Sequence, residues 1–144
     1  MPRQTYQSKR DFFDMREFSF GQVWKLEDTE IVIPNEDHLG TRNTHVERWV
    51  VVVSNNSENY HPLCPVVTVA PLSTRTDLKK KHDLELFSNS DNVKDDCLLQ
   101  LKLSQPILKK ELYDLQGEIS KDKKVELQVT LETYYGLVDE EEEE

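Results

Sequence analysis

Short apolar segments alternate with polar turns through most of the chain. The segments at 49–53 and 65–70 are continuous, rich in β-branched residues and bounded by turn formers. Runs of this length and composition favour strands buried on both faces, because a helix of similar content would be longer. Further strands are predicted over 18–26 (interrupted at Gly21), 83–87 and 99–103, with a short one within 112–119.

The C-terminal segment fits two patterns. Apolar positions alternate over 125–131, which on period alone favours a strand. However, Ser120 suits a helix N-cap and Gly136 suits the glycine that follows a helix. A helical stripe joins these ends, at Leu127, Leu131, Tyr134 and Val138. We predict a helix, and strands followed by one helix indicate an α+β fold with a curved antiparallel sheet or small barrel.

The length of 144 residues indicates one domain with a real core. We expect an N-terminal arm over 1–17, the folded domain over 18–138 and a disordered acidic tail over 139–144. The long polar segment between the first two strands, 27–47, is expected to be a loop, and loops of this length are usually functional or disordered.

The net charge of −10 limits the classes of partner. Six of the negative charges belong to residues 139–144, so residues 1–138 carry only −4. Proteins with an extended nucleic-acid footprint are normally basic, so only a local basic groove is expected here.

Other features of the composition point to the cytoplasm. No apolar run approaches the roughly 20 residues that a membrane span needs, and residues 1–10 show no secretory signal. Cys64 and Cys97 are isolated, which fits a reducing compartment. No pair of histidines has metal-ligand spacing, so no metal site is expected.

Several side chains near strand ends suit phosphate chemistry. Arg48 precedes one buried strand, and the hydroxyls of Ser73 and Thr74 end another. Arginine and hydroxyl groups held at such positions can grip a phosphate. Each also has a simpler interpretation, as an ion-pair partner or a turn cap.

The turn that follows is basic. Arg75 and Lys79 to Lys81 form its concentrated charge, and they are candidate contacts for an RNA backbone or simply a solvated loop. His82 comes next and is the favoured acid–base candidate, because histidine changes protonation near neutral pH. Trp49 could stack on a base.

Five motifs in order resemble the PemK/MazF (Kid-like) toxin family of type II toxin–antitoxin systems. They lie at 21–24 (GQVW), 47–55 (ERWVVVVSN), 69–74 (VAPLST), 102–106 (KLSQP) and 134–137 (YYGL). The similar family patterns include an opening G-[DE]-[IV]-W, a central R-P-V-V-V and a strand-end V-x-P-[IL]-T. The resemblance covers about residues 20 to 138.

The resemblance implies an SH3-like small antiparallel β-barrel with a C-terminal helix, as in CcdB, Kid and MazF. It also implies a homodimer, a cognate antitoxin, and a cofactor-free, metal-independent endoribonuclease that cleaves single-stranded RNA. In that reaction a ribose 2′-hydroxyl attacks the adjacent phosphodiester. The family's loop arginine corresponds to Arg48, its strand-end threonine to Ser73, and its glutamine to Gln105.

Three positions depart from the family pattern. Trp49 replaces a proline, Lys102 replaces an arginine and keeps its charge for RNA binding, and Ser104 replaces an acidic residue. Ser104 cannot act as a base. The resemblance therefore favours an endoribonuclease, with a catalytically degenerate protein-binding or regulatory module as the alternative.

Overall fold

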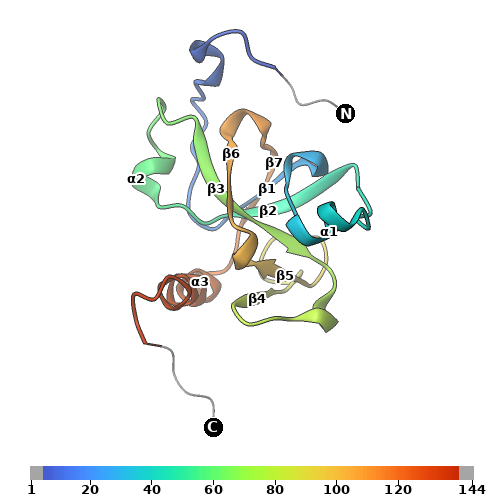
Figure 1. Cartoon of the computed structure of the whole chain (residues 1–144). Helices are drawn as coiled ribbons and strands as arrows, with labels where there is room; N and C mark the ends of the chain where they lie inside the picture. The colour runs from blue at the N-terminus through green and yellow to red at the C-terminus, as the bar shows by residue number, and fades with distance from the viewer. Residues whose placement is uncertain (1–4, 140–144) are drawn as a thin grey trace.

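The computed structural model describes residues 5–139, and within this range seven strands form an antiparallel sheet (Figure 1). The strand order is β4-β5-β3-β2-β1-β7, and β6 pairs with β3 beside this path. The strands are β1 (Gln22–Glu27), β2 (Glu47–Val52), β3 (Val66–Ser73), β4 (Asp83–Leu86), β5 (Cys97–Gln100), β6 (Gln105–Leu108) and β7 (Tyr113–Glu118). The helices are α1 (Pro34–Leu39), α2 (Asn56–Asn59) and α3 (Lys121–Tyr134), and 3₁₀ turns span Lys9–Phe12, Asp28–Glu30, Thr76–Leu78, Leu101–Leu103 and Lys109–Glu111.

The α+β fold with an antiparallel sheet and a C-terminal helix is therefore confirmed. The helix begins after Ser120, whose hydroxyl accepts a hydrogen bond from the Lys123 N–H. It ends at Tyr134, and two residues later Gly136 has φ +72° and the Leu137 N–H donates to the Glu132 carbonyl. Because only glycine adopts this backbone readily, Gly136 completes a Schellman cap. These caps outweigh the alternating pattern over 125–131.

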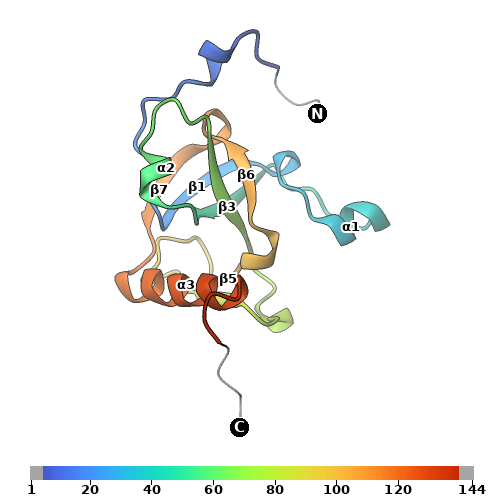
Figure 2. The same ribbon diagram turned by 60° about the vertical axis from the view of Figure 1, so that its left-hand side comes forward.

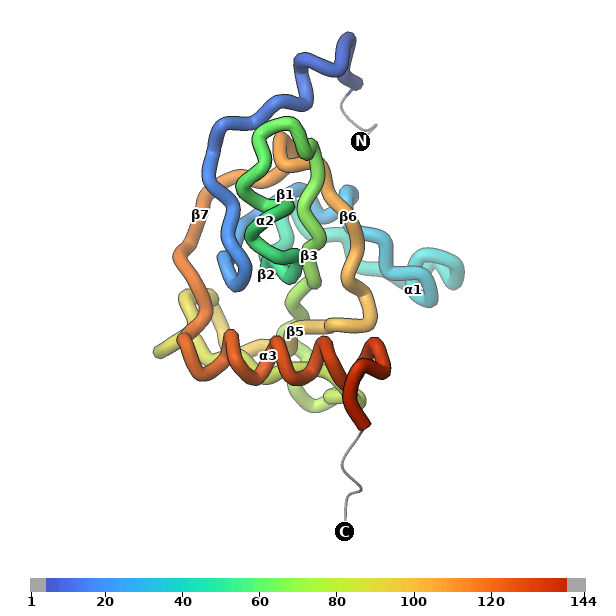
Figure 3. The backbone as a smooth tube through the Cα atoms, turned by 90° about the vertical axis from the view of Figure 1, so that its left-hand side faces the viewer, coloured from blue at the N-terminus to red at the C-terminus, as the bar shows by residue number. Residues whose placement is uncertain are grey.

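The sheet is buried on both faces, which explains the continuous apolar run of β2. Val51 and Val53 lie in one core cluster with Leu99 and Leu127, whereas Val50 and Val52 lie in a second cluster. α3 covers the first cluster, and Figures 2 and 3 show it crossing the end of the sheet that carries β5. β2 therefore separates the α3 face from the face that carries the second cluster.

The central strand β3 changes partner along one edge. Residues 66–69 pair with β6, whereas Leu72 and Ser73 pair with β5. Pro71 lies between these pairings, where its missing N–H costs no bond to a neighbouring strand. This switch places the end of β5 and the start of β6 beside the middle of β3.

Several predicted boundaries are wrong. The 99–103 strand ends at Gln100, and a 3₁₀ turn follows that keeps Leu101 buried and Leu103 partly buried. The first strand begins at Gln22 instead of Phe18, and Gly21 precedes it. The 27–47 segment contains a 3₁₀ turn and α1, so it is a partly structured excursion and not a simple loop.

Part of the N-terminal arm contacts the domain at the end opposite α3 (Figures 1 and 2). The Arg16 guanidinium binds the buried carboxylate of Asp14 and donates to the carbonyls of Lys109 and Leu112. Tyr6 donates a hydrogen bond to Glu111. Residues 1–4 of the predicted arm and 140–144 of the predicted tail lie outside the described residues.

Candidate active site

Arg48 and Ser73 lie at adjoining ends of the adjacent antiparallel strands β2 and β3. The pairing of these strands runs from Val52 and Val69 to Val50 and Pro71, two residues short of Arg48 and Ser73. Beyond it, Arg48 Nη1 donates a 3.3 Å hydrogen bond to the Leu72 carbonyl. The two predicted catalytic residues are therefore brought together at one end of the sheet.

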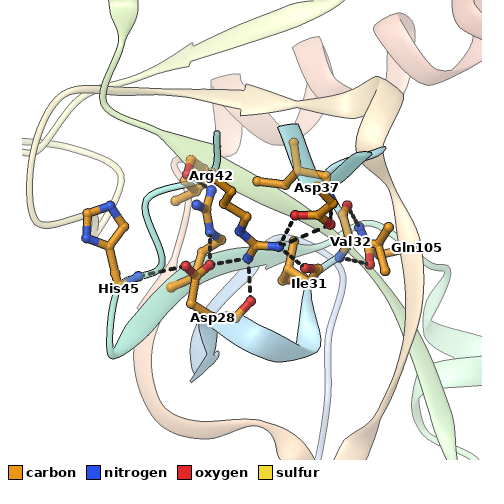
Figure 4. Close-up of polar contacts among 10 residues, drawn as sticks. Asp28, Ile31, Val32, Asp37, Arg42, His45 and Gln105 are labelled. Atoms are coloured by element: carbon orange, nitrogen blue, oxygen red, sulfur yellow. Dashed lines mark hydrogen bonds and ion pairs between the residues drawn. The ribbon is translucent and has the colours of Figure 1, made fainter. Parts of the chain in front are cut away.

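A buried carboxylate holds the Arg48 guanidinium in place. Asp28 directly follows β1, is fully buried, and its Oδ1 accepts a 2.6 Å hydrogen bond from Arg48 Nε. The same Oδ1 accepts a 2.6 Å bond from Arg42 Nη2, and Oδ2 accepts a 2.9 Å bond from the His45 backbone N–H. Figure 4 shows the Asp28 carboxylate between Arg42 and the backbone of His45.

Electrostatics keep Asp28 ionised. Burial alone raises the pKa of a carboxyl group, but the His45 N–H and the two guanidiniums outweigh it and hold the pKa of Asp28 below its usual value. Removing one partner of a buried ion pair typically costs about 3–5 kcal/mol, because it leaves an uncompensated charge. Asp28 is therefore a fixed negative charge, not a proton donor near neutral pH.

Arg48 retains a donor for another molecule. Nε binds Asp28 and Nη1 donates a 3.3 Å bond to the Leu72 carbonyl. Within the described residues, Nη2 has no hydrogen-bond partner, and it is not one of the buried polar atoms that lack one. Its two N–H groups can therefore bind an anion placed beside the Ser73 hydroxyl.

Ser73 itself is half-buried, and its hydroxyl accepts a 3.3 Å bond from the Arg75 N–H. The hydroxyl proton remains able to donate to a phosphate oxygen. Thr74 and Arg75 follow and are exposed, and the Arg75 guanidinium pairs with Asp77 in the same turn.

Trp49 lies on the opposite face of β2 from Arg48. Its half-buried ring packs against the first core cluster, and Lys25 Nζ lies 5.2 Å from the ring centroid. Because successive residues of a strand point to opposite faces, Trp49 and Arg48 project to opposite sides of β2. The structure therefore separates these two predicted contacts.

Gln105 and Lys102 line a different feature, a cavity of about 460 Å³. It runs along β6 beneath the 28–34 segment, and Glu30, Val32 and Glu111 also line it. The Gln105 amide is bound to the backbone of Val32, as Figure 4 shows. Ser104 donates its hydroxyl to the Leu101 carbonyl, so it closes the preceding 3₁₀ turn.

His82 lies farther from the Arg48–Ser73 pair. It precedes β4, which is separated from β3 by β5, and its ring packs edge-on against Tyr134 of α3 at 5.4 Å. Adjacent strands lie about 4.8 Å apart, so roughly two strand spacings separate His82 from β3. Lys79 to Lys81 precede it and are exposed, with Lys79 paired to Glu85.

Comparison with known families identifies one that the chain matches. Residues 27–135 match the model of the PemK-like, MazF-like toxins of type II toxin–antitoxin systems. The chain belongs to this family. A search of curated proteins found no match.

Solved structures show the same MazF-like fold. An endoribonuclease from Mycobacterial species, crystallised with its cognate antitoxin, is 22% identical, with a TM-score of 0.62 over 85% of this chain and 98% of that one. The MazE–MazF structure from Deinococcus radiodurans gives a TM-score of 0.58 at 16% identity, over 84% of this chain and 97% of the other. These likenesses establish the fold.

The sequence did not reveal two residues of the site in this MazF-like chain. Asp28 and Arg42 lie inside the excursion that was expected to be a loop, and no motif marks them. A weak signal existed, because an arginine next to a buried strand needs a counter-ion and Asp28 is the first aspartate after β1.

Two further absences concern the described residues alone. Over residues 5–139, no helix is long and apolar enough to cross a membrane. Over the same residues, no group of three His, Cys, Asp or Glu side chains has an arrangement that could hold a metal ion.

Proposed function

We propose that this MazF-like toxin is a metal-independent endoribonuclease that cleaves single-stranded RNA. One observation carries the proposal: the Arg48 guanidinium, fixed by a buried carboxylate, donates from Nη1 to the carbonyl of Leu72, the residue before Ser73, and keeps Nη2 available. The endoribonuclease described for the mycobacterial neighbour supports the same activity.

The reaction is an intramolecular transfer at phosphorus. The ribose 2′-oxygen bonds to the adjacent phosphorus as its proton passes to a water molecule, and the bond to the 5′-oxygen breaks as that oxygen takes a proton from water. The products are a 2′,3′-cyclic phosphate and a 5′-hydroxyl. Arg48 Nη2 and the Ser73 hydroxyl stabilise the negative charge that grows on the nonbridging oxygens.

A single-stranded substrate follows from this chemistry. The 2′-oxygen must lie in line with the departing 5′-oxygen, and an A-form helix resists that geometry. The RNA backbone on either side of the scissile phosphate then contacts the exposed cations Arg75, Lys79, Lys80 and Lys81. We assign His82 to this group of backbone contacts, because β5 lies between β4, which His82 precedes, and the strand of Ser73.

The remaining partners follow from the family. A type II toxin has a cognate antitoxin, and the mycobacterial neighbour was crystallised with its own. We extend the proposal to a homodimer acting in the cytoplasm. Light scattering of the purified protein measures its mass against the 16.9 kDa of one chain.

The test is cleavage of a long unstructured RNA in EDTA by the wild type, Arg48→Ala and Arg16→Ala. Arg16 is the matched control, because it also pairs with a buried aspartate, but its hydrogen bonds go to Asp14, Lys109 and Leu112 and not to Asp28, Arg48 or Ser73. We expect EDTA-resistant cuts from the wild type and Arg16→Ala, with a loss of about 100-fold or more in Arg48→Ala.

Two results would contradict the proposal. Equal cutting by Arg48→Ala and the wild type would remove Arg48 from the site. No cutting by the wild type would favour the protein-binding module, for which Ser104 in place of an acidic residue is the supporting observation.

A further inference from the structure

We infer that Asp28 is the positioning residue that aims Arg48 at the scissile phosphate. This inference rests on the proposed ribonuclease function and names a residue that the motifs do not mark. Asp28 would not touch the RNA. It would act through the direction it imposes on the Arg48 guanidinium.

The first argument is the completeness of the hydrogen bonding around Asp28. Both carboxylate oxygens are occupied, Oδ1 by Arg42 and Arg48 and Oδ2 by the His45 N–H. The carboxylate therefore cannot rotate without breaking a bond. A fixed acceptor gives the Arg48 Nε–H one direction and orients the planar guanidinium with it.

The second argument concerns Arg42. Its side chain is 10% exposed, and it donates to the Asp28 carboxylate, the Asp28 carbonyl and the Ile31 carbonyl. Its own Nε is buried without a hydrogen-bond partner in the described part of the chain. An orphaned donor is costly. Arg42 is held in place despite this cost, and it shares Asp28 Oδ1 with Arg48.

The third argument concerns the hydrogen-bond donors of Arg48 that Asp28 and Leu72 leave unused. Asp28 takes Nε and the Leu72 carbonyl takes one proton of Nη1, so the available edge is the Nη2 side. Ser73 directly follows Leu72, whose carbonyl accepts the bond from Nη1. Orientation of a catalytic group matters greatly, because a displacement of about 1 Å can cost about 100-fold in rate.

The experiment measures kcat and KM for RNA cleavage in EDTA by Asp28→Asn and Asp14→Asn. The Asp28→Asn change is isosteric, but it puts an NH₂ where an N–H donor now points. Asp14 is the matched control, because it is a buried aspartate paired with Arg16 away from the site. We expect a fall in kcat of about 100-fold with KM little changed for Asp28→Asn, and near wild-type values for Asp14→Asn.

A second readout does not depend on activity. The ¹⁵N Nε–H signal of Arg48, assigned by its loss in Arg48→Lys, should exchange slowly with water in the wild type and in Asp14→Asn. It should exchange much faster in Asp28→Asn. If Asp28→Asn does not fold, Asp28→Glu keeps the charge and shifts the carboxylate by one methylene, and the same two changes are expected.

The outcomes separate the two proposals. A wild type that cuts RNA while Asp28→Asn retains its kcat, or retains a protected Nε–H, would overturn the positioning role alone. A wild type that does not cut RNA would overturn the ribonuclease. The exchange of the Nε–H would then show only whether Asp28 fixes Arg48.

Discussion

The side-chain amide of Gln105 pairs with the backbone of Val32 in both directions. Gln105 Oε1 accepts a 2.9 Å bond from the Val32 N–H, and Nε2 donates a 3.1 Å bond to the Val32 carbonyl. Nε2 also donates to the Leu103 carbonyl. Gln105 therefore fastens the 28–46 excursion to the start of β6, and its amide is already committed.

Replacing Gln105 with alanine should loosen the excursion. The change removes both hydrogen bonds to Val32, an exposed residue at which water can replace them, so the free energy of unfolding should fall by about 1 kcal/mol. Urea unfolding measures this cost, and hydrogen exchange at the Val32 amide locates it. Gln128→Ala, at an exposed position of α3, is the control and should change neither. A Val32 amide that stays protected in Gln105→Ala would show that Gln105 does not hold the excursion against β6.

Asp28 should also shape the acid stability of the protein. Its pKa is below the ordinary 3.8 in the folded state, so it stabilises the fold above that pH, and this contribution is lost as the pH falls through the folded pKa. Urea midpoints measured between pH 7 and pH 2 should show Asp28→Asn well below the wild type at neutral pH. The gap should narrow below about pH 3.8.

The control for acid stability is Asp77→Asn. Asp77 pairs with Arg75, and its pKa is also lowered by that guanidinium, but both side chains are exposed and solvent screens the pair. Its midpoints should follow those of the wild type at every pH. A constant gap between Asp28→Asn and the wild type down to pH 2 would show that the charge of Asp28 is not what stabilises the fold.

The two cysteines should differ sharply in reactivity. Cys97 is buried in the first core cluster, and burial raises the pKa of its thiol to about 12. Cys64 is only half-buried. Titration with a thiol reagent should therefore count one thiol in the native protein, abolished by Cys64→Ser, and two thiols in denaturant. Rapid modification of Cys97 in the native state would contradict its burial.

The sequence predicted the framework well because local patterns controlled it. Continuous apolar runs predicted β2 and β3, since both faces of these strands are buried. Ser120 and Gly136 predicted the limits of α3, because caps depend on single residues. Where alternation continued into a turn, as at Leu101, the pattern was misleading, since a 3₁₀ turn buries that leucine as well as a strand would.

The candidate site was only partly predictable. The apolar runs predicted the strands beside Arg48 and Ser73, and the structure adds that these strands are neighbours in the sheet. The Asp28–Arg42–Arg48 cluster joins residues that are 20 positions apart through a buried carboxylate, and no period reports such a contact. Gln105 matched a motif, yet its backbone partner Val32 became visible only in the fold.

Gly117 should be among the least replaceable residues of the sheet. It pairs with Val23 where the register of β1 and β7 shifts, and its φ is +123°. A Cβ at this position would lie 2.8 Å from Cγ and Nδ2 of Asn92, whose amide donates to the Glu118 carbonyl. Gly117→Ala therefore combines backbone strain with a clash, and it should lower the free energy of unfolding by about 3 kcal/mol.

Gly136→Ala separates strain from clash. Gly136 also has a positive φ, but no atom lies within 4 Å of an added Cβ. That variant should lose only about 1 kcal/mol, which urea unfolding of both variants would measure. Equal losses would show that the Asn92 side chain moves aside freely. In that case the Asn92–Glu118 hydrogen bond would not hold β7 in its shifted register.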